Sequence, residues 1–217
     1  MQPILIIALA TAASVPLGLG LRHNLAALGY RNDDELDLPD PGPRWWVVWT
    51  SVIAIGSLAA AAVMSHNPLA FIPLIPLAVA GPWLAAVDFD VLRIPNRVLA
   101  PTALVSLLTI VGMAAATQHW RTFVVPVVAA SLVGGVFAVV HFATKSGVGF
   151  GDVKLAAAIS LAIGSFGAAT AWLGVLAGSV AALVWAKASR KVGPISYGPW
   201  LLCGAWFAVL ASAAAVG

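Results

Sequence analysis

A succession of long apolar segments, each bounded by charge, proline or glycine, restricts the folds open to this chain. Charged residues make up 9% of the 217 residues and hydrophobic residues 61%, against about 25% and about 45–50% in a soluble domain. A helix needs about 20 residues to cross about 30 Å of hydrocarbon. Segments of that size lie at about 3–20, 45–64, 69–87, 98–117, 122–143 and 199–216. The sequence therefore predicts an all-α, polytopic membrane protein.

A further apolar stretch, 153–186, is too long for one crossing, because it would reach about 50 Å as a single helix. We interpret it as a short helix and a second helix that turn near 164–168, which gives about eight transmembrane helices with short loops. Lys and Arg gather on the cytoplasmic side of membrane proteins. With eight spans and the first residue outside, ten of the eleven face inward and only Arg121 faces outward. If 153–186 were a single helix, seven basic residues would face inward and four outward, so eight spans are favoured.

The remaining residues exclude or disfavour several kinds of site and partner. Cys203 is the single cysteine, so an intramolecular disulfide and a multi-cysteine metal site are excluded. The basic residues are scattered rather than gathered in a stripe, so no nucleic-acid partner is expected. The four histidines lack metal-ligand spacing, and we expect no metal site. The first residues lack the basic start of a signal peptide, so we expect a retained first helix.

One sizeable polar segment, 22–44, interrupts the apolar chain. It is too short for an independent domain, and we expect a short cytoplasmic loop. Residues 1–217 are therefore expected to form a single integral membrane domain surrounded by lipid. Five of the eight acids lie in this loop, four of them within the acidic cluster 33–37.

The other three acids, Asp88, Asp90 and Asp152, lie at the ends of predicted spans. Asp88 and Asp90 follow the third span and Asp152 opens the sixth, which places all three on the cytoplasmic side. An acid at the membrane is costly unless it is paired or faces water, so it is a candidate for a functional site. Asp152 also suits a helix cap, and the two roles are compatible. We interpret Asp90 as a solvated or hydrogen-bonding neighbour whose replacement by Asn retains most activity.

Glycines surround Asp152 in "GVGFGD". Gly147, Gly149 and Gly151 allow positive φ and close approach of another segment, so an extended peptide has room beside the acid. A flexible loop between helices is the alternative. Lys154 is expected either to tune the acids electrostatically or to anchor the helix at the interface.

Residues after Asp88 carry a stop and start signal for helices. Pro95 restricts Ile94 to extended conformations, and Asn96 is expected to cap the span that begins near Val98. By this interpretation the "IPN" sequence sets the angle at which Asp88 is presented.

Three stretches resemble the type IV prepilin peptidase family. "DFDVLRIPNRVL", from Asp88, resembles its first aspartate motif, and "GVGFGDVKLAAAISLAIG" its Gly-x-Gly-Asp motif. "PISYGPWLLCGA", at 194–205, is similar to the segment before its last span. The similarity covers about 80–217. It implies a membrane aspartic endopeptidase of eight spans, with Asp88 and Asp152 as the catalytic pair and no cofactor. The first loop lacks the cysteines of bifunctional members, so zinc and methyltransferase activity are not expected.

The resemblance also implies a substrate and a location. The substrate class is a prepilin or pseudopilin precursor, with a short basic leader and a hydrophobic helix, cut at the cytoplasmic face of the inner membrane. Such proteins serve type IV pili or protein secretion. We hypothesise that the acidic cluster 33–37 attracts the basic leader, and a solvated loop without a partner is the alternative.

Rival functions remain open from the sequence. A preflagellin peptidase or a presenilin-like protease shares the motif of Asp152, although the spacing from Asp88 to "IPN" favours the prepilin group over presenilin. A transporter would place acids near the middle of its spans. A non-catalytic relative that scaffolds pilus assembly is a further alternative.

Overall fold

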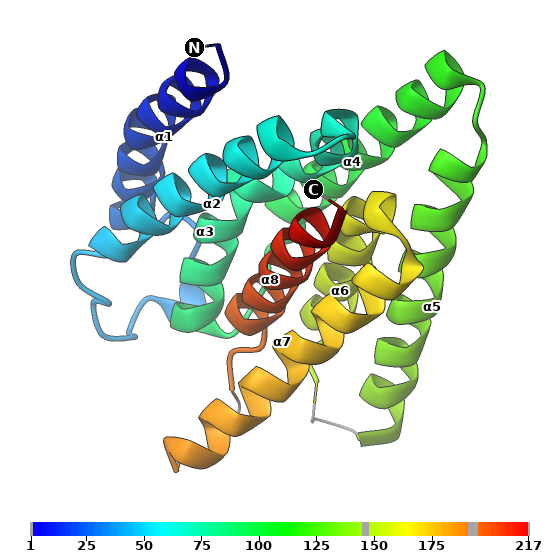
Figure 1. The fold of residues 1–217 in the computed structure, drawn as a ribbon. Coiled ribbons are helices and arrows are strands. Elements are labelled where there is room, and N and C mark those ends of the chain that lie inside the picture. The colour runs from blue at the N-terminus through cyan, green and yellow to red at the C-terminus, as the bar shows by residue number, and fades with distance from the viewer. Residues whose placement is uncertain (1, 145–147, 191–194, 217) are drawn as a thin grey trace.

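The computed structural model describes residues 2–144, 148–190 and 195–216 as a bundle of eight α-helices (Figure 1). No β-strand occurs among these residues, so the predicted all-α class is confirmed. The helices are α1 (Gln2–Ala26), α2 (Trp45–Met64), α3 (Ile75–Val91), α4 (Asn96–Thr117), α5 (Arg121–Thr144), α6 (Phe150–Ile163), α7 (Ala168–Ala188) and α8 (Gly198–Val216).

Seven of these helical segments are long and apolar enough to cross a membrane, which makes the chain a multi-pass membrane protein. The exception is α6, whose 14 residues reach only about 21 Å. A short 3-10 helix, Gly164–Phe166, follows it, and Gly167 has a φ of +115° that an L side chain rarely adopts. The predicted division of 153–186 into a short and a second helix, with a turn near 164–168, is therefore confirmed.

Two predicted helix ends are wrong, and one predicted segment is not α-helical throughout. α1 continues to Ala26 instead of ending near Gly20. The third segment begins as a 3-10 helix, Pro68–Leu74, where Pro73 lacks the N–H that an α-helix needs. α3 then continues to Val91, so Asp88 and Asp90 lie inside its last turn and not after it.

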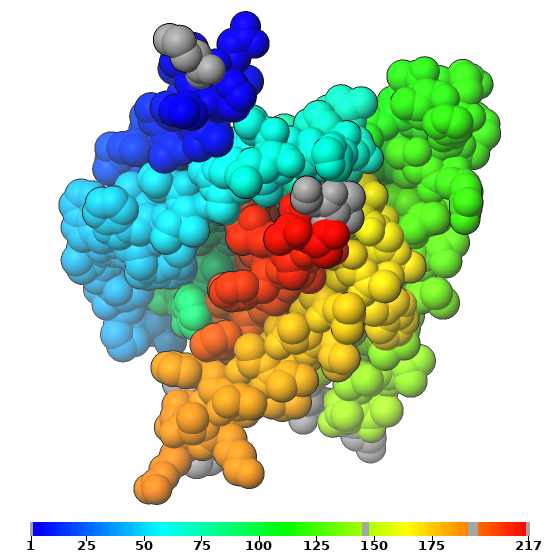
Figure 2. Space-filling model, in the orientation of Figure 1, coloured from blue at the N-terminus to red at the C-terminus, as the bar shows by residue number. Residues whose placement is uncertain are grey.

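The short helix α6 is largely enclosed by the bundle. Nine of its 14 residues are buried, and it contacts α4, α5, α7 and α8. On the face shown in Figure 2, α8 lies between α2 and α7. α7 and α8 approach closely, since a Cβ on Gly178 would lie 2.7 Å from the Leu201 Cα. Small residues permit this contact, as is usual between helices in membranes.

Four connections meet at one end of the bundle. Arg93, between α3 and α4, bonds to Glu35 in the α1–α2 connection, and Ser196, before α8, bonds to Asp88 at the end of α3. Gly149, before α6, lines a cavity at this end together with Arg93. Since α6 and α7 both have one end here, they form a hairpin that leaves and returns to the same end, as the eight-helix topology predicted.

Candidate active site

The last turn of α3 places Asp88 inside the bundle, where the residue is only 3% exposed. Its Oδ2 accepts two hydrogen bonds, from the Ser196 hydroxyl at 2.5 Å and from the Gly198 N–H at 2.9 Å. Leu92 ends α3 in a left-handed conformation and donates its N–H to the Asp88 carbonyl. The carboxylate of Asp88 is therefore held between the end of α3 and the beginning of α8.

Asp152 lies in the first turn of α6 and is 8% exposed. Its Oδ2 accepts the N–H of Gly149 at 3.1 Å, and its own N–H donates to the Gly149 carbonyl. The predicted capping role is thus correct, although Asp152 is the third residue of a helix that begins at Phe150 and not the residue before it. Burial, and then the charge of Asp88, raise the pKa of Asp152 from 3.8 to about 7.

Asp88 and Asp152 line one cavity of about 510 Å³ at this end of the bundle. Glu35, Arg93 and Lys154 line the same cavity. Residues from the first polar loop, α3, the α3–α4 connection and α6 therefore surround a single space. The sequence predicted that the two acids meet on one side of the membrane, and the structure brings them together.

The glycines beside Asp152 allow close approach. A Cβ on Gly151 would lie 3.2 Å from the Ile94 Cβ, so α6 begins directly against the α3–α4 connection. Gly149 has a φ of −68°, and neither it nor Gly151 adopts positive φ. The predicted close approach is confirmed for Gly151. The positive φ that glycine allows is used by neither Gly149 nor Gly151. Gly147 lies outside the described residues.

Pro95 and Asn96 begin α4, but Asn96 does not cap it. Pro95 is extended, with φ −69° and ψ 124°, and Asn96 is the first helical residue, without a capping hydrogen bond from its side chain. The Asn96 Oδ1 accepts a hydrogen bond from the Lys154 Nζ at 3.0 Å. Lys154 also lies 4.7 Å from the centre of the Phe150 ring. Asn96 and Lys154 thus join α4 to α6 at the rim of the cavity.

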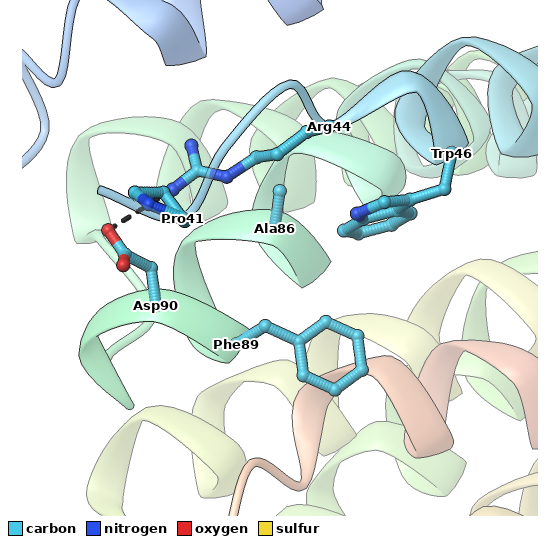
Figure 3. Close-up of a pocket in the computed structure, with 6 residues that line it drawn as sticks. All are labelled: Pro41, Arg44, Trp46, Ala86, Phe89 and Asp90. Carbon is cyan, nitrogen blue, oxygen red and sulfur yellow. Dashed lines mark ion pairs between the residues drawn. The ribbon is translucent and has the colours of Figure 1, made fainter. Parts of the chain in front are cut away.

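Asp90 lies outside this cavity, in a buried ion cluster. Its carboxylate pairs with Arg31 at 2.9 Å and with Arg44 at 3.2 Å, and it accepts the Tyr30 hydroxyl. The side chains of Asp90 and Arg31 are 7% and 1% exposed. Arg44 and Asp90 line a second pocket of about 340 Å³ with Trp46 (Figure 3). Asp90 was predicted as a solvated or hydrogen-bonding neighbour, and the structure shows the hydrogen-bonding one.

The partners of Asp90 were not predicted from the sequence. Tyr30, Arg31 and Arg44 lie about 60 and 46 positions away along the chain and resemble other residues of a polar loop. The one available signal was energetic, because a carboxylate in a largely apolar helix requires cations and donors nearby. That loop supplies them.

Glu35 and Arg93 form a second link between the first loop and the site. Arg93 donates to both Glu35 oxygens, at 3.0 and 2.7 Å, and to the Tyr30 carbonyl. These hydrogen bonds lower the pKa of Glu35. Of the acidic cluster 33–37, Glu35 is therefore already paired, whereas Asp33, Asp34 and Asp37 are exposed.

The family model for type IV leader peptidases matches residues 74–187, which is more than half of the chain and includes both buried acids. The chain belongs to the type IV leader peptidase family. Comparison with curated proteins and with solved structures found no match. The leader peptidase match ends before Ser196 and Gly198, so the two donors to Asp88 come from a segment that it does not include. In the described part of this peptidase, no group of three or more His, Cys, Asp or Glu side chains suits a metal ion.

Proposed function

We propose that this peptidase is an aspartic endopeptidase in which Asp88 and Asp152 act together on one peptide bond. The observation that supports the proposal is their position, since both carboxyl groups are buried and line the same cavity. Two carboxyl groups in one site do not both ionise cheaply, so one retains a proton near neutral pH. An ionised and a protonated carboxyl group together provide the base and the acid of peptide hydrolysis.

This pair of carboxyl groups, here called the dyad, can carry out both steps of peptide hydrolysis. The ionised carboxylate takes a proton from water, whose oxygen attacks the scissile carbonyl carbon, while the protonated carboxyl gives its proton to the carbonyl oxygen. In the second step the C–N bond breaks, the nitrogen takes the proton gained from water, and the other carboxyl recovers its own proton. The pair ends in its starting state, so neither a covalent intermediate nor a cofactor is part of the mechanism.

The proposed substrates are prepilin or pseudopilin precursors, with a short basic leader ahead of a hydrophobic helix. Membership of a leader peptidase family supports a leader as the part removed. A precursor whose helix lies in the bilayer carries the leader junction near the membrane surface, and the cavity lies at an end of a membrane-spanning bundle. The polar 22–44 loop and most of the basic residues lie at that end, which supports cleavage at the cytoplasmic face of the inner membrane.

Cleavage of a defined precursor tests this proposal. The purified protein, reconstituted in lipid vesicles, is incubated with prepilin, pseudopilin and preflagellin precursors, and the products are identified by mass spectrometry. We expect one cut between a basic leader and its hydrophobic helix in a prepilin or pseudopilin precursor. Cleavage of the preflagellin precursor alone would reassign the substrate. Failure to cut any of them, or equal cutting by the Asp88→Asn, Asp152→Asn double variant, would reject the aspartic mechanism.

Gly198→Ala is expected to lower kcat about 100-fold. The added methyl carbon would lie 2.9 Å from the Asp88 Oδ2, so the carboxylate must move, and a displacement of about 1 Å at a reacting group costs about 100-fold in rate. Initial rates of precursor cleavage check this value. Gly135→Ala is the matched control, because a Cβ there meets nothing within 4 Å. Equal rates for the two variants would show that the position of Asp88 does not limit the reaction.

A further inference from the structure

The two buried acids differ in the hydrogen bonds that they accept. The Asp88 Oδ2 accepts the Ser196 hydroxyl at 2.5 Å and the Gly198 N–H at 2.9 Å. The Asp152 Oδ2 accepts one backbone N–H, from Gly149, at 3.1 Å. The dyad is therefore not symmetric, and the difference comes from the segment that leads into α8.

This asymmetry determines where the shared proton is favoured. Both donors to Asp88 occupy the lone pairs of Oδ2, so a proton on Asp88 is restricted to Oδ1. Hydrogen bonds to an ionised acceptor are also stronger than those to a neutral one. Both effects favour the ionised form at Asp88. Asp152 accepts one longer bond from its own helix terminus, so its ionised form is stabilised less and both of its oxygens keep a lone pair for the proton.

We propose that Ser196 is a positioning residue that keeps Asp88 as the ionised member of the dyad and leaves the shared proton on Asp152. The inference rests on the proposed proteolytic function and assigns the roles within it. Asp88 takes the proton from the attacking water and later gives it to the leaving nitrogen. Asp152 gives its proton to the carbonyl oxygen and recovers it when the C–N bond breaks. The raised pKa of Asp152, about 7, agrees with this assignment.

Other titratable groups surround the dyad, and most of them have hydrogen-bond or ion-pair partners of their own. Glu35 and Arg93, from the first loop and the α3–α4 connection, bond to each other at the cavity wall. Lys154 of α6 donates to Asn96. On α3, Asp90 pairs with the loop arginines, and Tyr197 is a buried neighbour of Asp152 just before α8. Ser196→Ala leaves all of these groups in place, so its effect reports the lost hydroxyl.

The pH dependence of cleavage tests the role of Ser196. In the wild type, activity is expected to fall as pH rises through about 7, because Asp152 then loses the proton that it must donate. Ser196→Ala removes one of two donors to the ionised Asp88, so we expect the acidic limb of the kcat/KM profile to move up by about one pH unit. We expect the basic limb to stay within about 0.3 pH unit. Ser196→Thr, which keeps a hydroxyl, should restore the wild-type profile.

Ser179→Ala is the matched control for these profiles. The Ser179 hydroxyl donates to the Val175 carbonyl within α7, so its loss should leave both limbs unchanged. A Ser196→Ala profile that superimposes on the wild type would overturn the inference while precursor cleavage by the wild type still supported the protease. A shift confined to the basic limb would place the proton on Asp88 and overturn it equally.

Infrared spectroscopy tests the same assignment of the proton. Because it requires no cleavage, its result does not depend on the proposed function. At about pH 6, below the pKa of Asp152, the band of a protonated carboxyl group is expected in the wild type. Asp88→Asn should show the same band at a lower pH, because Asp152 no longer faces the charge of Asp88. It should be absent from Asp152→Asn, in which Asp88 remains ionised by its two donors. The reverse pattern would contradict the assignment whether or not the protein cuts a precursor.

Discussion

Asp88→Asn and Asp152→Asn are each expected to lower kcat/KM for precursor cleavage more than about 1,000-fold, because neither reaction step proceeds without both carboxyl groups. Asparagine has nearly the same shape as aspartate, and at Asp88 its oxygen still accepts from Ser196 and Gly198. The amide, however, neither takes a proton from water nor returns one. The rates of purified variants against a labelled precursor measure the effect.

Asp40→Asn is the control for loss of an acid. Asp40 is exposed and bonds only locally, to the Gly42 N–H, so we expect an unchanged rate. Gel filtration in detergent and thermal unfolding confirm that each variant is inserted and folded. If either dyad variant retained about a tenth or more of the wild-type kcat/KM, that residue would not be part of the catalytic pair.

Asp90→Ala is expected to lower the free energy of unfolding by about 3 kcal/mol, because it removes one partner of a buried ion pair. The side chains of Arg31 and Arg44 are only 1% and 6% exposed, and both pair with Asp90. Without that carboxylate two cations remain enclosed beside the end of α3. Denaturant or thermal unfolding in detergent measures this loss of stability. We expect the stability to fall even where the cleavage rate of the folded protein is unchanged.

Glu35→Gln provides the matched comparison for Asp90→Ala. Its partner Arg93 is 35% exposed, and a pair open to water contributes below about 1 kcal/mol. Equal losses of stability in the two variants would show that burial does not increase the contribution of the Asp90 ion pairs to the free energy of unfolding. Asp90→Asn keeps a hydrogen-bond acceptor and leaves the catalytic cavity unchanged, so we still expect most activity in the molecules that fold.

The membrane architecture could be predicted because hydropathy and charge record it directly. The turn at Gly164–Phe166 follows from the length of the apolar stretch and from the balance of basic residues. The position of Asp88 and Asp152 on one side follows from helix direction, since the two crossings of α4 and α5 lie between the end of α3 and the start of α6 and return the chain to the same side. These predictions use hydropathy and charge added over many residues, and a single side chain changes such totals very little.

The details at the ends of helices could not be predicted from the sequence. Asn96 has the character of a helix cap, but the Lys154 ammonium takes its oxygen, and that lysine lies on another helix. Asp90 was predicted as a solvated or hydrogen-bonding neighbour, but the residues next to it in the chain do not identify its partners. Its partners come from the first loop. Propensity is a local property, whereas these contacts are decided by the packing of distant segments.

The proposed dyad lies at the termini of three helices. Asp88 is at the end of α3 and Asp152 at the start of α6, and the donors to Asp88, Ser196 and Gly198, lie just before and at the beginning of α8. Helices adjust their tilt when the hydrophobic thickness of the surrounding bilayer changes. Because tilting displaces a helix terminus more than its centre, we expect the separation of the two carboxyl groups to change with acyl-chain length. By this expectation, the thickness of the surrounding lipid influences the geometry of the proposed dyad.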